Sequence, residues 1–308
     1  MEPLFILFKM KHLFGQSFPG FVSFRNVYDI LDPEAISMKL EEWLVSGDPV
    51  IRKLTQRYLF DQDVADTNSG YIQRYLDLFD QNTGRWGKAV YSPKWISTHY
   101  TMMELKYMEI PQGNPAYNQG IKTLLYAMWH PDKRPEQDMC VSAMMLGMAA
   151  YANYKDERMN EMVDYILAHR FPDGGWNCNW NSLTRPASKS SLHTTISVLE
   201  AFRDYLKNGY GYRRQEVASS VPFAEDFILR KHMFRSERTG AVINDAFTKC
   251  HYPERWHYDL FRGLEYFQSV QKPYDDRMSE ALDIVENRFK RSGYLTKGPS
   301  YAGRLHFI

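Results

Sequence analysis

Aspartate, cysteine and histidine, three residue types that bind zinc well, recur at a few positions of this sequence. Asp138 and Cys140 are separated by one residue at the start of an apolar stretch, Cys178 follows a Gly-Gly turn, and His193 opens a later apolar stretch. A thiolate, an imidazole and a carboxylate form a ligand set that zinc favours, and a catalytic zinc keeps one position open. The residue types and spacing therefore permit a zinc site that involves Asp138, Cys140 and His193, with Cys178 near enough in sequence to be a fourth ligand or a neighbour.

Each of these residues also has a purely structural interpretation. A cysteine on an apolar helix commonly packs as a small hydrophobic side chain, and a single histidine commonly caps a helix or makes a core hydrogen bond. Asp138 and Cys140 lie where the unpaired amides of a helix start favour negative charge. Both interpretations stay open on the sequence alone.

A shared spacing links three of the candidate residues. His99, Cys140 and His193 each precede a leucine by six positions, at Leu105, Leu146 and Leu199. His257 fits the same pattern with a shift of one residue. If these segments are equivalent helices, the four side chains face one mouth of the fold, and His257 and His99 are candidate acid or base groups there.

Aromatic residues make up 15% of the chain. Their rings can wall a cavity for an apolar molecule, or they can fill irregular gaps between helices. The candidate cavity residues are Trp86, Trp95, Trp176, Trp180, Trp256 and Tyr258.

The elements that must position these residues are helices. Apolar residues recur at three- and four-residue spacing, as at Ile121, Leu124 and Met128, and the segment 139–152 is apolar on most faces. Strand-like alternation is almost absent, and Gly and Pro clusters separate the helical segments. The pattern predicts an opening helix over 33–46 and then paired helices over 48–60 and 70–81, 96–109 and 115–129, 137–153 and 156–170, 190–207 and 213–232, and 256–271 and 275–291.

A repeated sequence motif indicates that these helices form repeating pairs. Gly84-Arg85-Trp86 precedes residues 98–101, and Gly174-Gly175-Trp176 precedes residues 192–195 in the same way. Because one helix pair cannot bury its apolar face alone, repeated pairs stack into an open solenoid or close into a ring, and fully apolar helices favour closure. We expect an all-α fold, an alpha/alpha toroid of about five to six helix pairs over 33–308, with an N-terminal extension over 1–32.

The block from Gly174 to Phe202 resembles the part of protein prenyltransferase beta subunits that reads Gly-Gly, Lys-Pro and Tyr-His-Thr before a leucine-containing helix. The Asp-x-Cys helix start at Asp138 resembles the same family. The resemblance implies that Asp138, Cys140 and His193 bind zinc and that the substrate is an isoprenoid or another apolar molecule. The family works with a separate helical subunit, so a partner subunit remains an open question here.

The sequence departs from this family and its relatives at identifiable places. The basic residues that precede Asp-x-Cys in the family are replaced by Asp132 and Pro135, with Lys133 and Arg134 beside them. Squalene and hopene cyclases, which share the toroid, protonate an alkene with an Asp-x-Asp-Asp cluster that this sequence lacks. Protonation-initiated cyclisation is therefore disfavoured.

Two other classes of function stay open. One is a noncatalytic toroid that binds an apolar ligand or a partner protein. The other is a glycoside-processing helical barrel, which needs two carboxylates across a cleft. The candidate carboxylates for that chemistry are Asp173, Asp245 and Asp259, although each also suits a capping or turn role.

Charge and composition limit the classes of partner that the chain is expected to bind. The chain has 38 Lys and Arg residues against 37 Asp and Glu, so it carries no strong field that would attract nucleic acid or an anionic membrane. Its longest apolar runs are shorter than the roughly 20 residues of a membrane span. Three cysteines, an odd number, fit reduced thiols. We expect a cytoplasmic protein with an apolar small-molecule substrate, no nucleic-acid partner and no membrane span.

Overall fold

A computed structural model describes residues 41–130, 138–292, 295 and 297–307. The chain forms two compact units. One unit contains the chain up to Arg74 together with Lys231–Pro253 and Asp259–Ser300, and the other contains Tyr75–Arg230, Glu254–Tyr258 and Tyr301–Ile308. We call them the terminal unit and the central unit, and describe each by itself. The expected N-terminal extension, most of the opening helix and the segment with Lys133 and Arg134 lie outside the described residues.

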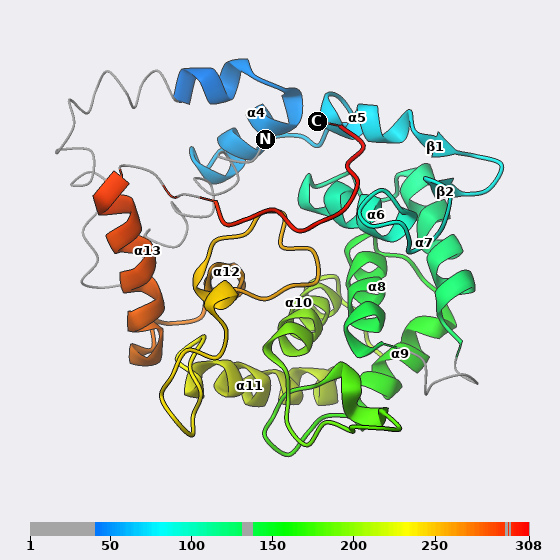
Figure 1. The fold of residues 1–308 in the computed structure, drawn as a ribbon. Helices are drawn as coiled ribbons and strands as arrows, with labels where there is room; N and C mark the ends of the chain where they lie inside the picture. Colours follow the sequence, from blue (N-terminus) through cyan, green and yellow to red (C-terminus); the bar gives the residue numbers. More distant parts are fainter. Residues whose placement is uncertain (1–40, 131–137, 293–294, 296, 308) are drawn as a thin grey trace. The chain divides into compact units, whose positions relative to one another are not determined.

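The central unit is built from two layers of helices. In one layer α8 packs against both α6 and α10, and in the other α9 packs against α11 while α7 bridges α6 and α8. Figure 1 shows α8 and α10 side by side, in agreement with their extensive contact. The helices are α6 (Thr98–Tyr107), α7 (Pro115–Met128), α8 (Met139–Tyr151), α9 (Glu157–Ala168), α10 (Leu192–Lys207) and α11 (Arg214–Arg230).

Helix α8 is the interior helix that the sequence predicts. Nearly all of its residues are buried, because its small and apolar side chains face neighbours on every side. Gly147 marks its closest approach to α10, since a β-carbon there would lie 3.3 Å from the Cα of Ala201. Small residues at this contact let the two backbones approach each other closely.

The sequence repeat corresponds to a repeated tryptophan anchor. The buried indole N–H of Trp86 donates to the backbone oxygen of Tyr75 at 2.7 Å, and that of Trp176 donates to the backbone oxygen of Ile166 at 2.6 Å. Each indole therefore fastens the loop after one helix to the end of that helix. The predicted equivalence of the two Gly-x-Trp loops is confirmed.

The same anchors fix the register of the helices that follow. The backbone N–H of Trp86 donates to Oγ1 of Thr98 at 3.1 Å, and that of Trp176 donates to Oγ1 of Thr195 at 3.1 Å. Thr98 is therefore the counterpart of Thr195. The leucine spacing instead pairs Thr101 with Thr195, so the sequence-based register of α6 is wrong by about one helical turn.

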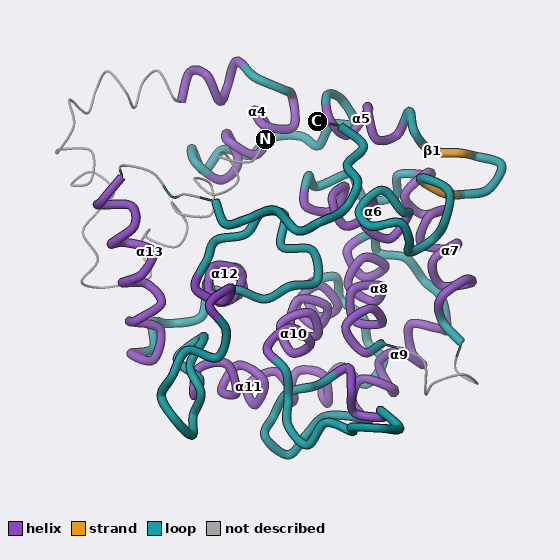
Figure 2. The backbone as a smooth tube through the Cα atoms, in the orientation of Figure 1, coloured by secondary structure: helices purple, strands orange, loops and turns teal. Residues whose placement is uncertain are grey.

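Helix starts and ends follow their capping residues. Asn114 accepts a hydrogen bond from the N–H of Tyr117 at 3.1 Å and Pro115 occupies the first turn, so α7 begins where predicted. The predicted helix over 70–81 is shorter, since α5 (Tyr71–Leu76) is followed by a two-stranded hairpin of β1 (Phe79–Asp80) and β2 (Arg85–Trp86). The strands found among the described residues are β1 and β2 of this hairpin (Figure 2).

The terminal unit contains the remaining helices. Asp259 begins α12 as its N-cap, accepting a hydrogen bond from the N–H of Arg262 at 2.9 Å, so the helix predicted from 256 starts four residues later. An ion pair between Arg235 and Glu280 ties the segment 231–253 to α13. The elements of this unit are α4 (Pro49–Tyr58), part of α5, η3 (Asp245–Thr248), α12 (Leu260–Ser269), η4 (Asp276–Met278) and α13 (Ser279–Ser292).

Candidate functional site

Cys140 and Cys178 lie in contact in the central unit. Cys140 is in the first turn of α8, and Cys178 begins the short 3-10 segment η2 (Cys178–Asn181) before α10. Sγ of Cys178 accepts hydrogen bonds from the backbone N–H of Cys140 at 3.2 Å and from Oγ1 of Thr194 at 3.4 Å. The two thiols also interact with each other. We call these two cysteines the thiol pair.

The contacts polarise the thiol pair. The hydrogen bond from Cys140 is the main cause that lowers the pKa of Cys178, and the Thr194 hydroxyl and the Cys140 N–H act in the same direction. The same thiol–thiol hydrogen bond, together with burial and the charge of Asp138, raises the pKa of Cys140. Negative charge is therefore favoured on Cys178, and Cys140 stays protonated.

Asp138, the N-cap residue of α8, lies within electrostatic range of both thiols. Partial burial raises the pKa of its carboxyl group, and the ammonium of Lys94 opposes this shift. A carboxylate near two thiols is compatible with a metal site, but here it also disfavours a second negative charge on the pair.

His193 makes a contact that defines its protonation. The backbone N–H of Tyr258 donates to Nδ1 of His193 at 2.7 Å. Because an amide N–H can only donate, Nδ1 is the acceptor and the neutral ring carries its proton on Nε2. Neither nitrogen then offers a lone pair to a metal ion while this bond exists.

The predicted zinc ligands are not gathered into one set. Among residues 41–130, 138–292, 295 and 297–307, no group of three or more His, Cys, Asp or Glu side chains is placed to share a metal ion. The thiol pair alone supplies two suitable donors, whereas a catalytic zinc needs three protein ligands. We therefore derive no reaction step through a metal.

His257 is held between two aromatic rings. Its ring stacks on Trp256 at 3.7 Å between centroids and on Tyr301 at 3.6 Å, the latter with an interplanar angle of 7°. His193 meets Trp256 and His257 edge-on at 5.4 and 5.8 Å. The structure therefore brings His193 and His257 together, and stacking on both faces fixes the plane of the His257 ring.

His99 is buried in a different environment. Its ring contacts Tyr91 and Tyr100 edge-on, at 5.3 and 5.0 Å between centroids. Neither ring nitrogen has a hydrogen-bond partner within the described part of the chain. Burial, with a smaller effect of Lys94, lowers the pKa of His99 to about 3. His99 is therefore neutral near pH 7. Because the register of α6 is shifted by about one turn, His99 is not the counterpart of His193.

The candidate cavity residues separate into two groups. Trp86 and Trp176 are fully buried repeat anchors, and Trp180 packs on His169 at 3.6 Å and donates to the hydroxyl of Tyr165 at 3.0 Å. Trp95 and Trp256 instead belong to two sets of stacked or edge-on rings that Lys94 links, and Tyr258 follows the second set in sequence. We call the two sets together the aromatic cluster, and it consists of Tyr91, Trp95, Tyr100, Trp256, His257 and Tyr301.

Lys94 joins the aromatic cluster and is a residue that the sequence analysis missed. Its Nζ lies 5.8, 5.5 and 5.4 Å from the ring centroids of Tyr91, Trp95 and Trp256. Burial raises the pKa of Tyr91, and the charges of both thiols and of Asp138 raise it further, so this ring lies within electrostatic range of the thiol pair. The aromatic residues Tyr91 and Trp95, which flank Lys94 in the sequence, are the feature that could have identified it.

The C-terminal segment also reaches this site. Trp95 donates its backbone N–H to the carbonyl of Arg304 at 2.9 Å and its indole N–H to the carbonyl of Tyr301 at 3.1 Å. His306 bonds to Oγ1 of Thr101 at 2.8 Å. The segment 301–307 therefore runs along the start of α6, as its red trace shows (Figure 1).

The carboxylates proposed for glycoside chemistry have structural partners. Asp173 accepts hydrogen bonds from the N–H of Ser190, at 2.9 Å, and from its hydroxyl, which ties the ends of one loop. Asp245 is the first residue of η3, and Asp259 caps α12 and accepts from the N–H of His251 at 2.8 Å. These contacts support a turn role for Asp173 and a capping role for Asp259, whereas Asn244, and not Asp245, caps η3.

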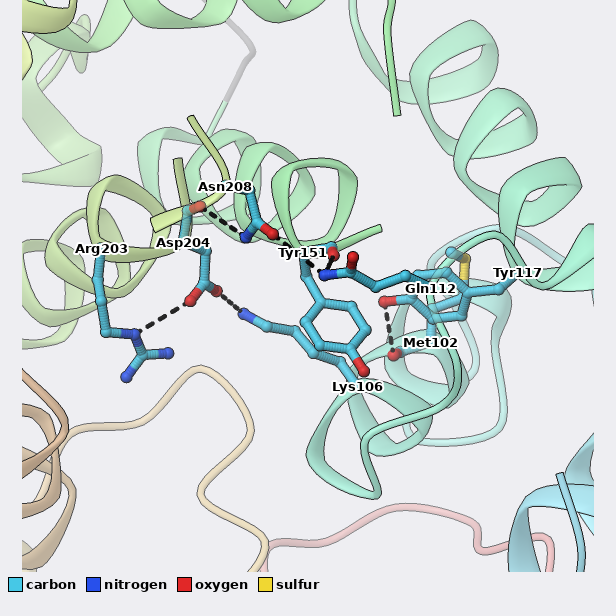
Figure 3. Close-up of polar contacts among 8 residues, drawn as sticks. All are labelled: Met102, Lys106, Gln112, Tyr117, Tyr151, Arg203, Asp204 and Asn208. Atoms are coloured by element: carbon cyan, nitrogen blue, oxygen red, sulfur yellow. Dashed lines mark hydrogen bonds and ion pairs between the residues drawn. The ribbon is translucent and has the colours of Figure 1, made fainter. Parts of the chain in front are cut away.

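A second polar group crosses the layer of α6, α8 and α10 elsewhere in the central unit (Figure 3). Asp204 forms an ion pair with Lys106 and another with Arg203, the latter at 3.0 Å. Burial alone would raise the pKa of Asp204, but the two cations outweigh it and lower the pKa below its ordinary value. The group pairs its charges internally, so we interpret it as a tie between α6 and α10.

Within the described residues, every helix is too short or too polar to cross a membrane. Comparisons with protein-family models, with curated proteins and with solved structures found no match to this chain.

Proposed function

We propose that this chain is an enzyme that acts on an apolar small molecule, of the isoprenoid class, and that its helix pairs continue into a closed toroid. The observation that carries the proposal is the polarised thiol pair beside the aromatic cluster. A thiolate beside aromatic rings offers a nucleophile or base and a surface for an apolar chain. Cys178 is the reactive group in this proposal, and His257 is the candidate acid or base.

Unpaired polar atoms support a ligand at this site over simple packing. Nε1 of Trp256 is buried and, like the ring nitrogens of His99, has no hydrogen-bond partner among the described residues. Buried polar groups nearly always have partners, so an unpaired indole N–H in the aromatic cluster favours a bound molecule that accepts its hydrogen bond.

Thermal unfolding in the presence of isoprenoids tests the substrate class. Farnesol or farnesyl diphosphate should raise the midpoint of unfolding, because a ligand that binds only the folded state stabilises it. Trp256→Ala should abolish the shift, while Trp43→Ala, which changes an exposed tryptophan, should keep it. If neither compound shifts the midpoint, isoprenoids are not the substrate class. Protection without product would instead support a noncatalytic binding protein.

Zinc dependence is a second candidate, favoured by the contact between the two thiols. Soft thiolates suit zinc, and the resemblance adds Asp138 and His193 as further ligands. Binding through His193 requires its hydrogen bond from Tyr258 to break, either to free Nδ1 or to let the proton move to Nδ1 and free Nε2. Elemental analysis of the purified protein is the test: near-stoichiometric zinc that is lost in Cys140→Ala and His193→Ala supports this candidate, and a folded protein without metal contradicts it.

A further inference from the structure

The thiol pair has the arrangement of a dithiol that can close into a disulfide. Cys140 and Cys178 are 38 positions apart, yet Sγ of Cys178 lies 3.2 Å from the backbone nitrogen of Cys140, and both side chains are only half-buried. A disulfide between them would join two residues that are already in contact. The third cysteine, Cys250, is buried in the terminal unit and serves as an internal control.

The contacts also distinguish the two sulfurs. Sγ of Cys178 accepts two hydrogen bonds, from the N–H of Cys140 and from the hydroxyl of Thr194. Donors directed at one sulfur stabilise negative charge on it, as they do for attacking thiolates. Cys140, in the first turn of α8, is placed to attack the Cys178 sulfur of a mixed disulfide formed there.

We propose that Cys140 and Cys178 form a redox-active pair that exchanges with small-molecule disulfides and closes reversibly into an intramolecular disulfide. This inference needs neither an isoprenoid substrate nor a metal, so it can fail or succeed independently of the proposed function. The closed form would join the start of α8 to the loop before α10, next to the aromatic cluster.

The reaction balances in two steps. The Cys178 thiolate attacks one sulfur of a disulfide RSSR, the S–S bond breaks, and one RS⁻ leaves and takes a proton as a mixed disulfide forms on Cys178. Cys140 then loses its proton to solvent and attacks the Cys178 sulfur, which releases the second RS⁻. The protein loses two electrons and two protons, and RSSR becomes two RSH.

Equilibration with oxidised glutathione tests the pair. The full chain is incubated with oxidised glutathione, denatured, treated with an alkylating agent and digested for mass spectrometry. We expect the peptides of Cys140 and Cys178 to be joined and unalkylated, and Cys250 to be alkylated. Excess reduced glutathione should restore alkylation at all three cysteines.

Single substitutions test the roles of the two sulfurs. Cys140→Ser should trap glutathione on Cys178, because the second step is removed, while Cys178→Ser should accumulate at least tenfold less adduct. Thr194→Val should slow adduct formation on Cys178 several-fold. Cys250→Ser should form the internal disulfide as the unchanged protein does.

Three results would overturn the proposal. The first is full alkylation of both Cys140 and Cys178 after equilibration with oxidised glutathione. The second is a disulfide that includes Cys250. The third is stoichiometric zinc in the purified protein with a thiol pair that oxidised glutathione cannot oxidise until a chelator removes the metal.

Discussion

The backbone N–H of Tyr258 donates a hydrogen bond to Nδ1 of His193, with 2.7 Å between the nitrogens. This contact joins the first turn of α10 to the segment that carries Trp256 and His257. It fixes the orientation of the imidazole and places its proton on Nε2. The ring is thereby set up as a hydrogen-bond donor toward the site, and a metal ion would have to change that state.

Replacing His193 should therefore destabilise the folded chain. In His193→Ala the N–H of Tyr258 loses its acceptor in a mostly buried position, which costs about 1–3 kcal/mol of unfolding free energy. Urea unfolding followed by circular dichroism measures the change. His130→Ala is the matched control, because His130 is exposed and its effect should stay within about 0.5 kcal/mol. Equal stability of the two variants would contradict the role of the contact.

The two tryptophan anchors should contribute similar stabilisation. Trp86→Phe and Trp176→Phe each keep an aromatic ring but reduce its volume and remove the indole N–H, so the backbone oxygen of Tyr75 or Ile166 loses one of its two donors. We expect each variant to lose about 1–3 kcal/mol of unfolding free energy. The control is Trp43→Phe at an exposed tryptophan, which should change the free energy by less than about 0.5 kcal/mol. Loss in only one of the two anchors would argue against their equivalence.

The C-terminal segment should protect His257 from chemical modification. Tyr301 covers one face of the His257 ring, so Tyr301→Ala removes the stacked ring while Tyr301→Phe preserves it. We expect diethyl pyrocarbonate to modify His257 several-fold faster in Tyr301→Ala than in the unchanged chain. Peptide mass spectrometry identifies the site, and Tyr301→Phe should match the unchanged chain. A similar rate in all three proteins would show that the segment does not shield the ring.

Sequence reasoning predicted the helices well because their apolar periodicity is strong and their ends carry capping residues. The range predicted for α7, 115–129, differs from the observed Pro115–Met128 by one residue. The failure over 70–81 has a local cause, since residues 79–86 form a hairpin whose strands are too short to show alternation.

The candidate site was predicted only in part. The structure brings Cys140 and Cys178 into contact, and the sequence had offered Cys178 as a fourth ligand or a neighbour. Lys94 and Tyr301 could not be assigned, because long-range packing from separate loops brings them to the site. The register of His99 was wrong because the leucine spacing aligned Leu105 with Leu199, whereas the contact of Thr98 with Trp86 aligns Met102 with Leu199.

His99 should make the folded chain sensitive to mild acid. The ordinary pKa of histidine, about 6.5, applies in the unfolded chain, whereas burial lowers the pKa of His99 to about 3 in the folded chain. Between these values the unfolded state binds a proton that the folded state excludes, so stability falls as the pH drops below about 6.5. From pH 7 to pH 5 the loss is about 2 kcal/mol. His99→Phe should remove this loss in paired urea unfolding curves at the two pH values, and His130→Ala should retain it. An unchanged pH dependence in His99→Phe would show that His99 is not the group responsible.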